Sequence, residues 1–276
     1  MTKSSHIYKN PDDYSKNNNL QFEFAMQTIK NIEISSTARV LDIGCGDGLI
    51  TSKIADKATK GSVIGTDISQ QMINHANEKY KEQKNLRFMQ MDASKNIFKN
   101  QFDVITSFNC LHWVKDQQAA LKGIAQAATE GARIILLFSH KKSLYHHVLD
   151  DVCSSEKWKL YFKNYINPRS FFTKETYKKM LSHEHLNVLS IVEKEMSYQF
   201  QDAAELTKFF SSSMSQVTHL PTEKRDEFLA DFSSEFVKQL RIKKIKDNTL
   251  TFWCLEINAT TEKQLVYQQQ RVISKL

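Results

Sequence analysis

The chain has 276 residues, of which 41% are hydrophobic and 25% charged, a composition typical of a folded globular protein with a sizeable core. No apolar run approaches the ~18 residues that span a bilayer, and residues 1–19 lack the apolar segment of a signal peptide, so we expect a cytoplasmic protein that does not contact a membrane. The net charge of +7 is spread along the chain, and its densest run, residues 241–246, predicts a solvated helix end. The alternative for this run is a site for an acidic carrier protein or nucleic acid, although we expect no nucleic-acid partner.

The first half of the chain alternates predicted strands with predicted helices. A loosely held arm over residues 1–19 precedes a helix near residues 20–29. Strands are predicted at residues 39–43, 62–67, 86–91, 102–108 and 132–139, and helices at residues 49–58, 70–82 and 117–128, the last ending near Gly131. This alternation with short connections predicts a doubly wound parallel sheet with right-handed crossovers.

The second half contains no glycine after Gly131 and has a different pattern. Helices are expected over most of residues 140–185 and again within residues 202–246, with strands near residues 187–197 and 249–258. We therefore predict one domain over residues 1–276, with a seven-stranded, mostly parallel sheet of the α/β class. Its central part would span residues 36–139, and the later helices would cap the sheet.

The pattern Asp42-x-Gly44-x-Gly46-x-Gly48 follows the first strand. It contains three of the seven glycines, and glycine allows positive φ angles and a close approach of ligand to backbone. Because neither GxGxxG nor GxxxxGK[ST] is present, an adenosine with an amino-acid tail fits this turn better than a nucleotide with a phosphate chain. The alternative is a tight turn without a ligand, although Asp42, at the mouth of a buried strand, needs a partner.

Acidic residues also end the next two strands. Asp67, 23 residues after Gly44, is placed to accept hydrogen bonds from ribose hydroxyls, and Asp92 from an adenine amino group. Helix capping and turn formation are the alternatives for these two acids. Ile68 and Met72 are placed either to cover an adenine face or to pack in the core.

Together these motifs resemble those of the class I S-adenosylmethionine-dependent methyltransferases. The resemblance covers roughly residues 36–139. The segments that carry it are residues 40–48, 65–69 with Met72, 91–93 and 102–113. It implies S-adenosyl-L-methionine as cofactor, with its methionine end held by the glycine turn and its amino group held by Asp42, often through water. It also implies that the following residues bind the cofactor: Asp42, Gly44, Gly46, Gly48, Asp67, Ile68, Met72, Asp92, Ala93 and Asn109.

Residues outside this central part carry a narrower resemblance. Residues 19–21, 111–117 and 155–158 are similar to juvenile hormone acid methyltransferases, and residues 111–113 also resemble trans-aconitate methyltransferases. Residues 198–203 with 218–220 resemble the malonyl-carrier-protein methyltransferase of biotin synthesis. Since all three families methylate a carboxylate oxygen, the resemblance implies a small carboxylic acid or an acyl-carrier-bound acid as substrate.

We expect the substrate to bind beside the residues that follow the fourth strand. These residues are Asn109-Cys110-Leu111-His112, without the [DN]-P-P-[YF] sequence of many enzymes that methylate amino groups of nucleic acids. Gln21, His112 and Trp113 are the candidates for positioning a substrate, and packing within the core is the alternative for the last two. An ionised carboxylate would need only donors, whereas a phenol, amine or carbon acid would need His112 as a base.

Several other residues are weaker candidates. His140 follows the fifth strand, and Arg169 could pair with an anionic substrate, although a surface arginine is the simpler interpretation. The pairs His146/His147 and His183/His185 are expected at the surface, and four widely spaced cysteines predict neither a metal site nor disulfides. The sequence leaves the acceptor and the oligomeric state open. The alternatives are a methyltransferase for a quinone-type, lipid or amine acceptor, and a cofactor-binding regulator without catalysis.

Overall fold

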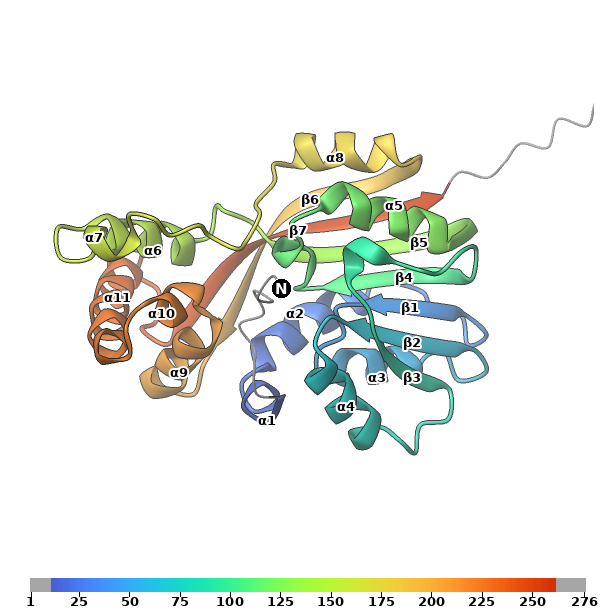
Figure 1. Cartoon of the computed structure of the whole chain (residues 1–276), viewed down its shortest axis with the longest axis horizontal. Helices are drawn as coiled ribbons and strands as arrows, with labels where there is room; N and C mark the ends of the chain where they lie inside the picture. Colours follow the sequence, from blue (N-terminus) through green and yellow to red (C-terminus); the bar gives the residue numbers. More distant parts are fainter. Residues whose placement is uncertain (1–10, 262–276) are drawn as a thin grey trace, which may run out of the picture.

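The computed structural model describes residues 11–261, which form a seven-stranded sheet with helices around it (Figure 1). The sheet order is β3-β2-β1-β4-β5-β7-β6. Strand β7 is antiparallel to β5 and β6, and the other neighbouring pairs are parallel. The mostly parallel, doubly wound sheet predicted from the sequence is therefore confirmed. The strands are β1 (Arg39–Ile43), β2 (Ser62–Asp67), β3 (Leu86–Gln90), β4 (Phe102–Phe108), β5 (Ala128–Ser139), β6 (Leu186–Gln199) and β7 (Thr249–Thr261).

The helices follow the predicted order, with two local differences. Only the short turn η1 separates β3 from β4, so the strand–helix alternation is interrupted there. Strand β5 begins at Ala128 and continues through Gly131, which has a φ of 72°, so the prediction that a helix ends near Gly131 was wrong. The helices are α1 (Pro11–Ser15), α2 (Asn19–Ile29), α3 (Leu49–Ala55), α4 (Gln70–Lys79), η1 (Ala93–Lys95), η2 (Leu111–Trp113), α5 (Gln117–Ala127), α6 (Leu144–Ser154), α7 (Lys159–Phe162), α8 (Lys174–His183), α9 (Ala203–Ser213), α10 (Ser215–His219) and α11 (Thr222–Ile242).

The central strands are apolar on both faces because helices cover both sides of the sheet. In β1, Val40 belongs to one hydrophobic cluster, whereas Leu41 and Ile43 belong to the other. The same alternation separates Ile135 from Ile134 in β5, since successive side chains of a strand point to opposite faces. This double burial fixes the register of β1 and β4, and with it the positions of the loops at their carboxyl ends.

Strands β6 and β7 extend past the carboxyl edge of the parallel strands. The last pair shared with β5 is Ser139 with Cys254, and beyond it residues 195–199 pair only with residues 249–253. Helices α6, α7, α9, α10 and α11 surround this two-stranded extension in Figure 1. The predicted helical cap therefore stands beside the edge of the sheet at which the glycine turn lies.

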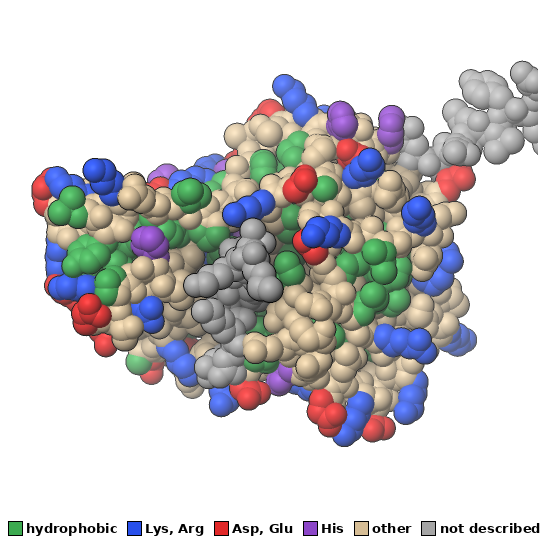
Figure 2. Space-filling model, viewed as in Figure 1, with side chains coloured by type: hydrophobic (Ala, Val, Ile, Leu, Met, Phe, Trp, Pro, Cys, Tyr) green, Lys and Arg blue, Asp and Glu red, His purple; other side chains and the backbone are tan. Residues whose placement is uncertain are grey.

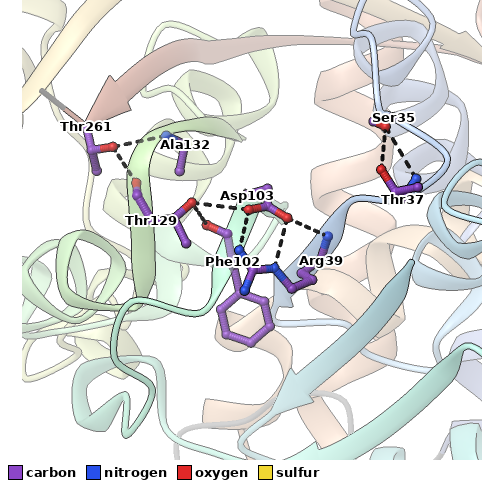
Figure 3. A network of polar contacts seen from close by, with 8 residues as sticks. All are labelled: Ser35, Thr37, Arg39, Phe102, Asp103, Thr129, Ala132 and Thr261. Carbon is purple, nitrogen blue, oxygen red and sulfur yellow. Dashed lines mark hydrogen bonds and ion pairs between the residues drawn. The ribbon is translucent and has the colours of Figure 1, made fainter. Parts of the chain in front are cut away.

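A polar network ties the strands together at the opposite edge (Figure 3). Arg39, at the start of β1, donates from its backbone N and from Nε to Asp103 Oδ2, each at 3.0 Å. This pairing with the Arg39 guanidinium lowers the pKa of Asp103. Thr129 donates to the Phe102 carbonyl, and Thr261 at the end of β7 donates to the Thr129 carbonyl at 2.6 Å. Strands β1, β4, β5 and β7 are thus linked far from the glycine turn.

Charged side chains are mixed on the visible face of the described chain. Figure 2 shows Lys and Arg interspersed with Asp and Glu over that face rather than gathered in one patch. Arg241, in the densest basic run, is exposed and pairs with Asp247. That run is an exposed helix end, as predicted. Within residues 11–261, no helix is long and apolar enough to cross a membrane.

Candidate functional site

The glycine turn joins β1 to α3 at the carboxyl edge of the sheet. Gly44, Gly46 and Gly48 all have positive φ angles, of 79°, 53° and 81°. A Cβ atom on Gly44 would lie 2.2 Å from Cys110 Sγ, at the exit of β4. The turn is therefore closely packed against the β4 exit. The strand order of the sheet reverses between β1 and β4, which is where open α/β sheets bind ligands.

Asp42 lies beneath this turn and is 2% exposed. Its two carboxylate oxygens accept hydrogen bonds from Thr51 in α3 at 2.6 Å and from Thr106 in β4 at 2.7 Å. Burial raises its pKa to about 6, although the two hydroxyl donors oppose that shift. Asp42 thus finds the partners that its burial requires and joins β1, α3 and β4. Its contact with a ligand amino group stays a prediction.

Asp67 and Asp92 lie at the ends of the neighbouring strands β2 and β3. Asp67 accepts from Gly46 N at 3.1 Å and from Ser69 N at 2.8 Å, which links it directly to the glycine turn. Asp92 accepts from the backbone N and the hydroxyl of Ser94. Asp92 is the N-cap of η1, and Asp67 forms a turn with Ser69, which itself is the N-cap of α4. Both acids therefore have local structural roles of the kind foreseen as alternatives.

The apolar candidates beside these acids differ in exposure. Ile68, next to Asp67, is 45% exposed, whereas Met72 is 1% exposed and Ala93 is also buried. Ile68 is therefore the one of these three with a large free surface for an adenine ring. Met72 has the core-packing role that the sequence left open.

Asp47, inside the glycine turn, has a role that the sequence analysis missed. It is buried and accepts hydrogen bonds from Ser15 at 2.8 Å, Asn18 at 3.1 Å and Lys79 at 3.3 Å. The Tyr14 ring lies over the turn, 3.3 Å from the position a Cβ of Gly46 would take. The prediction of a loosely held arm is therefore wrong for residues 14–18, whereas residues 1–10 lie outside the described chain. No local pattern in the sequence pairs Asp47 with residues so far away.

A cavity of about 540 Å³, partly open to solvent, lies between the sheet edge and the cap. Gln21 from α2, His112 and Trp113 from η2, and Asn109 from the β4 exit all line it, so the structure brings the predicted substrate residues together. The other lining residues are Tyr14, Leu20, Phe24, Ser139, Arg169, Phe209, Ser213, Phe252 and Cys254. None of the lining residues is an acid.

Four of the lining residues present buried polar atoms without a hydrogen-bond partner in the described chain. These atoms are Gln21 Oε1, Asn109 Nδ2, Arg169 Nε and Ser213 Oγ. An unsatisfied buried polar group costs about 1–3 kcal/mol, so four around one cavity indicate a site for a polar ligand. Asn109, which follows β4 and lines the cavity, also has a φ of 55°, a conformation that is uncommon for a residue other than glycine.

His112 is buried, and its Nδ1 accepts a hydrogen bond from Ser139 N at 3.3 Å. Burial, followed by the nearby Arg169, holds its pKa well below the usual value. The imidazole is therefore neutral at pH 7, and because Nδ1 is the acceptor, Nε2 carries the proton. His112 is a hydrogen-bond donor toward any group that approaches Nε2.

His146 is buried behind the cavity, so its predicted surface position was wrong. Its Nε2 lies 2.9 Å from Ser139 Oγ, and burial holds its pKa well below the usual value. The α6 helix that carries it packs against β7 and α11, contacts that the sequence does not reveal. His147, His183 and His185 are exposed as predicted. His140 does not line the cavity and instead lies 3.8 Å from Glu193.

Arg169 also departs from its expected surface position. Its guanidinium lies 4.4 Å from the centre of the Trp113 ring, and Nη2 donates to the Ser213 carbonyl at 2.8 Å. The next residue, Ser170, donates its N–H to the His112 carbonyl at 2.7 Å. Arg169 is thereby attached to the same turn that holds His112 and Trp113.

Comparisons with known proteins place this arrangement in a family. A family model described as a methyltransferase domain matches residues 40–131. The protein named "Putative methyltransferase 235L" of Invertebrate iridescent virus 6 is 28% identical over 82% of this chain and 84% of its own. The juvenile hormone acid O-methyltransferase of Bombyx mori is 26% identical over 84% of this chain and 87% of its own. A solved SAM-dependent methyltransferase of Aquifex aeolicus shares the fold, with a TM-score of 0.54 at 14% identity over 91% of this chain and 98% of its own. The chain belongs to the class I S-adenosylmethionine-dependent methyltransferases.

The site of this methyltransferase fits its cofactor, S-adenosylmethionine. The glycine turn offers backbone without side chains, Ile68 offers an exposed apolar surface, and Asn109 offers an amide N–H without a partner in the described chain. Among residues 11–261, no group of three or more His, Cys, Asp or Glu side chains could hold a metal ion, and the four cysteines are free. The family match ends at Gly131, so it does not include Gln21 or Arg169.

Proposed function

We propose that this methyltransferase esterifies a carboxylate of a small organic acid. Bound S-adenosylmethionine supplies a methyl group on a sulfonium, and its transfer to a carboxylate oxygen leaves a methyl ester and S-adenosylhomocysteine. The enzyme's contribution is then mainly positioning, electrostatics and exclusion of water. The observation that carries the proposal is the state of His112, a buried neutral donor in a cavity lined by Arg169 and by no acid.

The choice of acceptor follows from proton transfer. A carboxylic acid has a pKa of about 4 and is already ionised at pH 7, whereas a phenol or an amine must lose a proton to react. His112 cannot take that proton at Nε2, which already carries one. His146 reaches the cavity only through Ser139, and its pKa is held well below the usual value. An acceptor that needs no base is therefore the best match.

We further assign the cofactor contacts residue by residue. The glycine turn with Asp42 would hold the methionine end, Asp67 the ribose hydroxyls, and Asp92 with Ala93 the adenine. Ile68 would cover the ring, and Asn109 would meet the methionine end beside the turn. These assignments are supported by the adjacency of the β1, β2 and β3 ends and by the direct bond from Gly46 N to Asp67.

The relatives support an acid as the substrate. The matched proteins of Bombyx mori and Drosophila melanogaster are named juvenile hormone acid O-methyltransferases, and each aligns over more than two thirds of this chain. A free small acid suits a cavity that is lined by apolar and polar side chains and is partly open to solvent. A carrier-bound acid would place only its acyl end there.

The reaction is tested by the lability of the transferred methyl group. The protein would be incubated with methyl-labelled S-adenosylmethionine and a panel of carboxylic acids, phenols and amines. A carboxylate acceptor gives a product from which mild base releases labelled methanol. A product that keeps its label in base would overturn the carboxylate assignment. A rise in melting temperature with S-adenosylmethionine, without any labelled product, would favour the non-catalytic alternative.

Substitutions of His112 distinguish a donor from a base. In His112→Gln, the side-chain amide offers an N–H near the position of Nε2, so we expect kcat for an esterified acid to fall by no more than about tenfold. In His112→Ala the donor is lost, and we expect kcat to fall about 100-fold. Steady-state kinetics with the same acid measure both effects.

His140→Gln is the matched control, because His140 follows the same strand but does not line the cavity. Its kcat should equal that of the wild type. Equal losses of activity in His112→Gln and His112→Ala, with both variants folded, would contradict the donor role and return His112 to the role of base.

A further inference from the structure

The guanidinium of Arg169 is a half-buried cation that forms no ion pair with the described residues. Its Nε is buried and has no hydrogen-bond partner in the described chain. By contrast, Arg39 and Arg241 each pair with an aspartate. A guanidinium that lines a cavity without acids is suited to bind a ligand that supplies the negative charge.

Two contacts hold this guanidinium, and two more hold the backbone beside it. The Trp113 ring lies against the guanidinium at 4.4 Å, and the Ser213 carbonyl accepts from Nη2 at 2.8 Å. The backbone N of Arg169 donates to Asn167 Oδ1 at 3.0 Å, and the neighbouring Ser170 N donates to the His112 carbonyl. Because these contacts come from η2, α9 and the segment between α7 and α8, the cation is held in place before a ligand arrives.

The polar groups of the cavity that accompany Nε of Arg169 are suited to bind one carboxylate. Ser213 Oγ, also without a partner in the described residues, belongs to the residue whose carbonyl holds Arg169, and the amide of Gln21 lines the same cavity. From these contacts we infer that Arg169, Ser213 and Trp113 form an anion seat for the carboxylate to be methylated, an inference that rests on the proposed function. In this seat Nε donates to one carboxylate oxygen, and the other oxygen attacks the methyl group.

The apolar remainder of the cavity determines what the seat accepts. Leu20, Phe24, Phe209 and Phe252 line it, and Arg169 is the only lining residue that is charged at pH 7 whatever its surroundings. One fixed cation among aromatic walls favours acids with a single carboxylate over acids with two or three. The anion seat therefore raises the affinity of the site for the acid and makes it bind the acid in preference to the neutral amide.

The test compares charged and neutral probes. Straight-chain monocarboxylates from acetate to dodecanoate, each with its neutral amide, would be titrated into the protein saturated with S-adenosylhomocysteine. For the acid that binds best, we expect Arg169→Gln to weaken binding at least about tenfold, with Arg169→Lys intermediate. Binding of the matching amide should change less than about threefold. Arg225→Gln is the control, because Arg225 also donates to a main-chain carbonyl, that of Leu220, but lies outside the cavity.

The outcomes separate the seat from the reaction. Equal weakening of acid and amide in Arg169→Gln would show a packing role only and overturn the seat, as would failure of every acid to bind the wild type. An acid esterified with the same KM by the wild type and by Arg169→Gln would also overturn the seat while leaving the reaction intact. An acid that binds through Arg169 without being esterified would support the seat and contradict the proposed reaction.

Discussion

Replacing Gly44 by alanine is expected to destabilise the protein by about 2–5 kcal/mol and to abolish measurable cofactor binding. A Cβ at this position would lie 2.2 Å from Cys110 Sγ and 2.3 Å from Cys110 Cβ, much closer than atoms in contact. Gly44 also has a φ of 79°, a conformation that costs an L-residue about 1–2 kcal/mol. Overpacking adds about 1–3 kcal/mol, and the turn must shift away from β4 to relieve it.

A double-mutant cycle separates the clash from the backbone strain. Cys110→Gly removes both clashing atoms, so Gly44→Ala should cost about 1–2 kcal/mol in that background instead of about 2–5 kcal/mol. Urea unfolding of the four proteins gives the coupling free energy. Gly46→Ala is the control within the turn, since its nearest neighbour is the Tyr14 ring at 3.3 Å, which can move. Equal costs for Gly44→Ala in both backgrounds would contradict the role of Cys110.

The sequence predicted the sheet well because the necessary information is local. Each of β1, β2 and β3 is a short apolar run with an acid at or just after its end, and glycines after Asp42 mark the turn. The apolar residues on both faces of β5 agree with its position between β4 and β7. The start of β5 was missed because the positive φ of Gly131 lies inside a strand with a register shift rather than after a helix.

The side of the cavity that faces the cap could not be predicted in the same way. Arg169 and His146 were expected at the surface because their side chains are polar, although the apolar neighbours of His146 in α6 are buried. Their positions depend on the extension of β6 and β7 beyond Ser139, which carries the cap against the sheet edge. Long-range packing of this kind leaves no periodic signal within one segment. An isolated arginine between aromatic segments was the only sequence cue for Arg169.

Gln21, His112, Trp113 and Asn109 were found from the sequence only through a family resemblance. Their meeting in one cavity agrees with that resemblance, whereas their roles stay proposals. Asp47 is the opposite case, because it lies within the glycine motif and yet its structural role could not be predicted from that motif. From the sequence, a carboxylate between two glycines is expected to be a turn residue. The structure shows that its partners are the distant residues Ser15, Asn18 and Lys79.

Replacing Asp67 by alanine is expected to weaken binding of S-adenosylhomocysteine at least about 100-fold. A carboxylate that accepts from both ribose hydroxyls makes two charge-assisted hydrogen bonds, each contributing about 1.5–3 kcal/mol. The substitution also leaves Gly46 N and Ser69 N without their acceptor, so part of the loss could arise in the turn itself. Isothermal titration of the wild type and the variant measures the total effect.

Deoxy analogues distinguish direct ribose contact from damage to the turn. In the wild type, the 2′-deoxy and 3′-deoxy forms of S-adenosylhomocysteine should each bind about tenfold more weakly than the parent compound. In Asp67→Ala these penalties should disappear, because the partner of both hydroxyls is gone. Asp92→Ala is the matched control, because Asp92 accepts from Ser94 N as Asp67 accepts from Ser69 N. This variant should weaken binding while keeping both penalties. If Asp67→Ala retained them, the ribose would be held by another residue, and Asp67 would serve only to join β2 to the glycine turn.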